Sequence, residues 1–154
     1  MMPAAPVSLD ERLAALVQQW RGRAFAWGVV DCCQFARAAL VQIHGVPADR
    51  LPDPVYTNPT DALAHWQRLG GFDSLATTAG LCAVNVARAA RGDLVLVPAL
   101  PKQFKGHALA VVVGQTALLL GAEGLRAVHR RFWGAAYTPR PSSQDQGGAP
   151  CHKQ

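Results

Sequence analysis

The chain has 154 residues, of which 50% are hydrophobic and 16% are charged. This balance predicts one folded domain with its own core and excludes a disordered chain. The N-terminal segment has neither the basic nor the apolar region of a signal peptide, and no apolar run reaches the roughly 18 residues of a membrane span. We therefore expect a protein that is made in the cytoplasm and does not span a membrane.

The formal net charge of +5 is uneven. Residues 62–154 carry ten basic and four acidic side chains, whereas residues 1–61 carry five and six. The basic residues are scattered and have no aromatic stacking platforms between them, which is not typical of a nucleic-acid surface. We expect a solvated basic surface and no nucleic-acid partner.

Four cysteines stand at positions 32, 33, 82 and 151. Their spacings match no paired zinc or iron–sulfur pattern, so we expect reduced thiols, no metal and no cofactor. Cys82, in "GLCAVNVA", is expected to be a small core residue.

Helical patterns dominate the first half of the chain. The first predicted helix follows Ser8, which forms a capping pattern with Glu11, and it ends near Gly22. A second helix is predicted over residues 31–44, with Asp31 as the N-cap.

A third helix is expected to be capped by Asn58 or Thr60, and the stretch after Gly71 is ambiguous, with a short helix and a connection as its interpretation. After Gly92 the pattern changes to short β-like runs separated by Gly, Pro and Gln. This order predicts an α+β domain over residues 8–138, in which N-terminal helices pack on an antiparallel sheet made from residues 93–133. Residues 139–154 are rich in Pro, Ser and Gly and are predicted to form a flexible C-terminal arm.

The second predicted helix starts with two adjacent thiols. Cys32 lies in phase with Phe35, Ala39 and Ile43 on the inward face, and Cys33 is turned by about 100° from it. We therefore expect Cys32, not Cys33, to face a cleft. The helix macrodipole favours a thiolate at this position, which suits a nucleophile, whereas free cysteine is also a common buried hydrophobe. Both interpretations stay open on spacing alone.

Three stretches together carry a family resemblance: "FAWGVVDCCQF", "RGDLVLV" and "HALAVVVG". In this order they resemble the NlpC-type, papain-like cell-wall peptidases, and more closely an uncharacterised branch encoded in phage and prophage tail gene clusters. The resemblance covers roughly residues 10–137. It implies a papain-like fold in which Cys32 is the nucleophile and His107 the base, acting on amide bonds of peptidoglycan stem peptides.

The resemblance also makes a prediction about geometry. Counted back from Gly114, the histidine of the family motif falls on Ala108, so His107 is predicted to point away from Cys32 unless a bulge near Gly106 intervenes. The next strand, "TALLLG", offers no obvious third catalytic residue. His129 is expected to be a surface residue among arginines, and two helix histidines, His44 and His65, to be surface or capping residues.

Two functions follow. The first is a structural or assembly component of a phage tail tip or baseplate, with other tail proteins as partners and with degenerate or weak hydrolase chemistry. The second is an active peptidoglycan cysteine endopeptidase. Both imply a protein made in the host cytoplasm and located in the virion tail.

Overall fold

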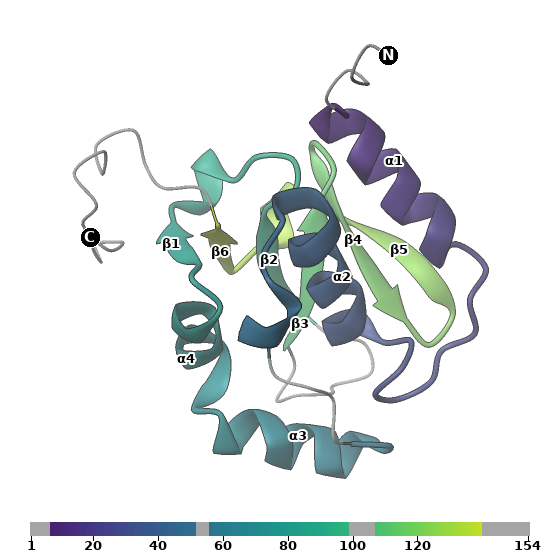
Figure 1. Cartoon of the computed structure of the whole chain (residues 1–154), viewed down its shortest axis with the longest axis vertical. Helices are drawn as coiled ribbons and strands as arrows, with labels where there is room; N and C mark the ends of the chain where they lie inside the picture. The colour runs from purple at the N-terminus through teal and green to yellow at the C-terminus, as the bar shows by residue number, and fades with distance from the viewer. Residues whose placement is uncertain (1–6, 52–55, 99–106, 140–154) are drawn as a thin grey trace, which may run out of the picture.

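The protein is described here as a computed structural model that covers residues 7–51, 56–98 and 107–139. Within these ranges the fold is α+β, with four α-helices and a six-stranded antiparallel sheet (Figure 1). No helix of the described part is both long enough and apolar enough to cross a membrane. The predicted C-terminal arm lies outside the described residues from position 140 onward.

The first two helices begin and end as predicted. Helix α1 spans Leu9–Trp20, and Ser8 and Glu11 form the expected capping box. Helix α2 spans Cys32–His44, with Asp31 as the N-cap and Gly45 as a left-handed C-cap. The two helices pack against each other, and the rings of Trp20 and Phe35 meet edge to face at 5.7 Å.

Two shorter helices follow. Helix α3 spans Pro59–Arg68 and is capped by Asn58, one of the two residues expected to do so. Helix α4 spans Gly71–Thr78 and occupies the stretch whose sequence was ambiguous. The first turn of α4 is bonded to the sheet, because the Tyr137 hydroxyl donates to Asp73 Oδ1 at 2.8 Å.

The sheet has the strand order β1-β6-β2-β3-β4-β5, and every pairing is antiparallel. Four of its strands match predicted β-like runs, whereas β1 and β6 were not predicted. Both are short, and their small or mixed side chains have no clear alternating pattern. The strands are β1 (Cys82–Val84), β2 (Leu94–Pro98), β3 (His107–Val112), β4 (Thr116–Gly121), β5 (Gly124–His129) and β6 (Ala135–Thr138).

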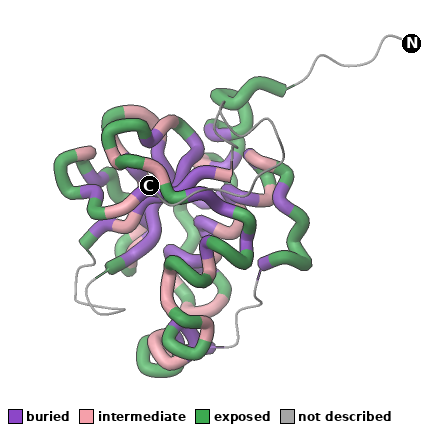
Figure 2. The backbone as a smooth tube through the Cα atoms, turned by 90° about the vertical axis from the view of Figure 1, so that its left-hand side faces the viewer, coloured by how far each residue is buried: buried purple, intermediate pink, exposed green. Residues whose placement is uncertain are grey.

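Helices α1 and α2 lie over one face of the sheet (Figure 1). Leu40 of α2 and Leu109 of β3 line the same cavity, so the side of β3 that carries Leu109 is the side on which α2 packs. The buried residues gather in the interior between helices and sheet (Figure 2). The expected packing of the cysteine helix on an antiparallel sheet is therefore confirmed.

Cys82 differs from the expectation of a reduced core thiol. It is 9% exposed and disulfide-bonded. It opens the edge strand β1 opposite Thr138, close to the point where the chain leaves the sheet. The spacing of the cysteines along the sequence does not indicate this bond, which is why it was missed.

Candidate functional site

The candidate site begins at the turn before α2, where Asp31 organises the backbone. Its carboxylate accepts hydrogen bonds from Gly28 N at 2.7 Å and from Gln34 N at 2.9 Å. Gly28 has a φ of +78°, and the turn is closed by pairing between Ala26 and Val30. Since Asp31 is fully buried, one carboxylate holds both the turn and the first turn of the helix. This explains why the stretch "WGVVD" precedes the thiols.

The two thiols that follow are buried side by side. Cys32 and Cys33 are free, each is 5% exposed, and their Sγ atoms lie 3.8 Å apart. Cys32 lies on the buried stripe with Phe35 and Ala39, as its helical phase predicted. Neither sulfur is open to solvent.

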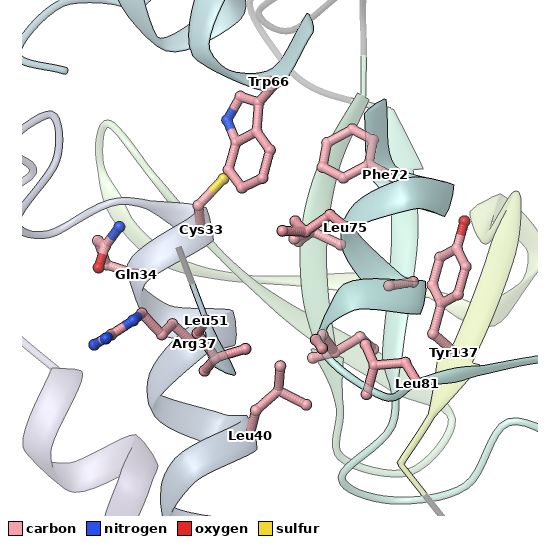
Figure 3. Close-up of a pocket in the computed structure, with 14 residues that line it drawn as sticks. Cys33, Gln34, Arg37, Leu40, Leu51, Trp66, Phe72, Leu75, Leu81 and Tyr137 are labelled. Carbon is pink, nitrogen blue, oxygen red and sulfur yellow. The ribbon is translucent and has the colours of Figure 1, made fainter. Parts of the chain in front are cut away.

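Cys33, and not Cys32, lines a small cavity beside α2. The expectation that Cys32 faces the cleft is therefore wrong for this cavity. Its volume is about 50 Å³, and in Figure 3 the Cys33 sulfur points toward the indole of Trp66. Helices α3 and α4 create the cavity by packing on the Cys33 side of α2, a layer that the periodicity of α2 cannot reveal. The other walls are mainly apolar and include Leu40, Leu51, Phe72, Leu75, Leu94 and Leu109.

The surroundings of Cys33 oppose a thiolate. Burial raises the pKa of the Cys33 thiol, and the neighbouring Cys32 and Asp31 raise it further. Tyr56 lowers the pKa of Cys33, but by less than burial, Cys32 and Asp31 raise it. The helix macrodipole was expected to favour a thiolate at the neighbouring Cys32. At Cys33 the buried N-cap carboxylate of Asp31 acts against one. The second thiol is therefore a protonated apolar neighbour rather than an activated nucleophile.

Sequence reasoning missed Tyr56 and misjudged His65. Tyr56 is 4% exposed, and its hydroxyl lies close enough to Cys33, Gln34 and Asp31 to interact electrostatically. It forms no hydrogen bond of good geometry with the described residues. Tyr56 stands in a Pro- and Asp-rich segment with no periodicity, so nothing in the sequence indicates that it folds back onto α2.

His65 was expected on the surface of its helix but is only 8% exposed. Its ring lies 5.7 Å from that of Tyr56 and 5.8 Å from that of Trp66. Burial lowers the pKa of His65, and Arg68 lowers it further. The correction follows from the rings of Tyr56 and Trp66, which lie against a helix face that would otherwise be exposed.

His107, the expected base, opens β3 and is exposed. The register with β2 is regular from Pro98–His107 to Leu94–Val111, so His107 projects to the same side as Leu109. That side is the one on which α2 packs. The prediction that His107 points away from the cysteine helix is therefore wrong.

The physical reason lies in the turn after β3. The prediction counted back from Gly114, but Val113 N donates to the Thr116 carbonyl at 2.9 Å and closes a tight hairpin there. A count back from this turn does not show which face of β3 meets α2, whereas the regular pairing with β2 fixes the phase of His107 relative to Leu109. No bulge near Gly106 is needed to bring His107 to the α2 side.

The strand β4, which was not expected to supply a third catalytic residue, does not meet β3 near His107. β3 and β4 pair only through Val111–Leu118 and Val112–Ala117, far from His107. Within the described residues, no hydrogen bond joins the His107 ring to either sulfur. The structure thus places His107 on the α2 side of the sheet without a hydrogen bond to a thiol.

The other histidines have structural contacts. His44 Nε2 donates to the Gly92 carbonyl at 2.8 Å and joins the end of α2 to the turn before β2. Gly92 has a φ of +91°, and a Cβ there would lie 3.1 Å from His44 Nε2, which explains the glycine of "RGDLVLV". His129 is exposed, and its Nδ1 accepts from Arg131 N at 3.2 Å, in line with the expected surface role.

Metal ligation has no support in the described ranges, where no three His, Cys, Asp or Glu side chains are grouped to hold an ion. The arrangement offers two buried thiols, a capping carboxylate and one exposed imidazole on the same side of a sheet.

A search of curated proteins finds no match to the chain. A family model described as a domain of unknown function, DUF6950, matches residues 7–138, which include every helix and strand described above. The chain therefore belongs to the DUF6950 family.

Proposed function

We propose that this domain has a papain-like, NlpC-type fold and serves as a structural or assembly component of a phage tail tip or baseplate, with weak or lost hydrolase chemistry. The proposal starts from the resemblance of "WGVVDCC", "RGDLVLV" and "HALAVVVG" to NlpC-type peptidases. It is supported by the arrangement of these stretches, since the thiol pair opens a helix that packs on the strand begun by His107. Such a domain is made in the host cytoplasm and resides in the virion tail.

The burial of the thiols is the observation that favours a scaffold over an enzyme. A cysteine nucleophile needs an accessible thiolate and an imidazole within about 4 Å. Cys32 and Cys33 are each 5% exposed, and no described imidazole is hydrogen-bonded to either of them. The buried carboxylate of Asp31 opposes a negative charge on Cys33. These features suit a stable core better than turnover.

An active peptidoglycan endopeptidase is the second candidate, and the position of His107 favours it. In this mechanism His107 takes the proton of the Cys32 thiol, and the sulfur attacks the carbonyl carbon of a stem-peptide amide. The leaving amine takes the proton from His107, and water then hydrolyses the thioester to regenerate the thiol. Backbone N–H groups at the start of α2 would stabilise the oxyanion.

Hydrolysis of purified peptidoglycan separates the two candidates. We expect the wild-type protein to release no more soluble peptide than Cys32→Ala, which loses a small buried group at a cost of about 1 kcal/mol and should stay folded. His107→Ala should behave in the same way, and His129→Ala is the matched control for loss of an exposed histidine. Robust hydrolysis that is lost in Cys32→Ala and His107→Ala but kept in His129→Ala would establish the enzyme instead.

The assembly role has a separate test. Mass spectrometry of purified particles of the encoding phage or prophage should detect the protein in tail fractions. We also expect particles made without it to have incomplete tails. Its absence from intact particles with normal tails would contradict the assembly role.

A further inference from the structure

Within the described residues, the outer edge of β5 is a free sheet edge. β5 spans six residues, Gly124–His129, and pairs only with β4 among the described strands. The opposite edge of the sheet is the three-residue strand β1. An unpaired edge presents N–H and C=O groups that can hydrogen-bond an added strand. β5 is thus the longer available template.

A hollow of about 600 Å³ lies beside this edge, between the end of α1 and the β4–β5 hairpin. Its floor is largely apolar and includes Val17, Phe25, Leu118 and Leu125. Leu125 and Ala127 project from β5 toward the α1 side, because they pair with Leu120 and Leu118 on that face of β4. A strand added at the edge would place alternate side chains over this hollow.

Arginines flank the edge on both faces of the sheet. Arg21 and Arg23 line the hollow on the α1 side, and Arg126 of β5 projects to the other face, opposite Leu119. All three are exposed, and no acidic side chain of the described residues pairs with them. Glu123, in the hairpin turn, is the acidic residue that lines the hollow. The edge is therefore positively charged along both faces.

We propose that the free edge of β5 binds an extended, acidic segment of a partner protein, which adds to the sheet as a further strand. Acidic side chains on the two faces of that segment meet Arg21, Arg23 and Arg126, and an apolar side chain enters the hollow. A second copy of the chain is a poor occupant, because pairing two β5 edges would bring the arginines of both copies along one seam. The free backbone groups and the apolar floor favour a peptide over a nucleic acid.

This inference deepens the proposed assembly role and rests on it for the origin of the partner. The binding itself is measured on the full chain alone. The probe is a capped octapeptide, Glu-Glu-Val-Glu-Glu-Glu-Val-Glu, which as a strand carries glutamates on both faces and its valines on one face. ¹⁵N-edited NMR records which amides shift on titration. We expect shifts at residues 124–129 and weaker binding at higher salt.

Matched variants identify the contacts. Arg23→Glu and Arg126→Glu should each weaken binding about tenfold, whereas Arg88→Glu, an exposed arginine in another part of the fold, should leave it unchanged. The same peptide with alternate backbone nitrogens methylated keeps its charge but cannot pair with a strand, so it should not bind.

Several results would overturn the proposal: no binding of the octapeptide, equal binding of the methylated peptide, shifts away from β5, or tighter binding of single-stranded DNA at the same residues. A protein found in tail particles that binds no acidic peptide keeps the assembly role and loses the edge proposal. Specific peptide binding by a protein absent from particles gives the reverse result.

Discussion

The Asp31 carboxylate holds together the turn before α2 and the first turn of α2, and Asp31→Ala removes it. The substitution deletes the acceptors of hydrogen bonds from Gly28 N at 2.7 Å and Gln34 N at 2.9 Å. Loss of an N-cap costs about 1 kcal/mol, and a partly buried N–H left without a partner costs about 1–3 kcal/mol more. We therefore expect the free energy of unfolding to fall by about 2–4 kcal/mol.

Asp31→Asn provides an intermediate step. Its side-chain oxygen can still accept from one of the two N–H groups, while its NH₂ group faces the other donor. We expect a loss of about 1–2 kcal/mol, between wild type and alanine. Asp49→Asn is the matched control, because Asp49 is an exposed carboxylate on another surface turn.

Urea unfolding followed by tryptophan fluorescence measures these differences. The midpoint should shift while the dependence of free energy on urea concentration stays constant. If Asp31→Ala cost less than about 0.5 kcal/mol, or no more than Asp49→Asn, the carboxylate would not hold the turn and the helix together, and the reasoning would be refuted.

Two further predictions concern the layer around the cavity. Tyr137→Phe removes the 2.8 Å hydrogen bond to Asp73 and should lower the free energy of unfolding by about 1 kcal/mol in urea; an unchanged midpoint would show that this bond does not hold α4 to β6. Burial lowers the pKa of His65, so the unfolded state binds a proton at this residue more readily than the folded state does. Neutral His65 therefore contributes stability above the unfolded-state pKa of about 6.5, and this contribution should be lost as the pH falls toward the folded-state pKa. His65→Gln should flatten urea midpoints measured between about pH 7 and pH 5, and His129→Gln, at an exposed site, should not; equal slopes in wild type and His65→Gln would contradict this.

Local structure could be predicted from the sequence where neighbouring residues determine it. Ser8 with Glu11, and Asp31 before a helical run, are capping patterns whose hydrogen bonds close within a few residues. The β-like runs after Gly92 became β2 to β5 for a similar reason, since two-residue alternation and turn residues specify strands and hairpins locally. The helix phase also placed Cys32 correctly in the core.

What surrounds those elements depended on tertiary packing. Helix periodicity places Cys33 about 100° from Cys32, yet both are equally buried, because Leu51 and the helices α3 and α4 cover the second side of α2. The burial of His65 has the same origin. Contacts between segments far apart in the chain leave no periodic signal, so this layer could not be predicted.

The side of the sheet on which His107 lies shows most clearly what the sequence could not predict. Its phase relative to Leu109 follows from strand alternation and could be predicted, whereas the face on which α2 packs could not. The sequence by itself determined the caps, the strand runs and the relative phases of side chains, because these are set by local backbone geometry. Only the tertiary structure decided which faces meet, because that depends on how distant apolar surfaces bury one another.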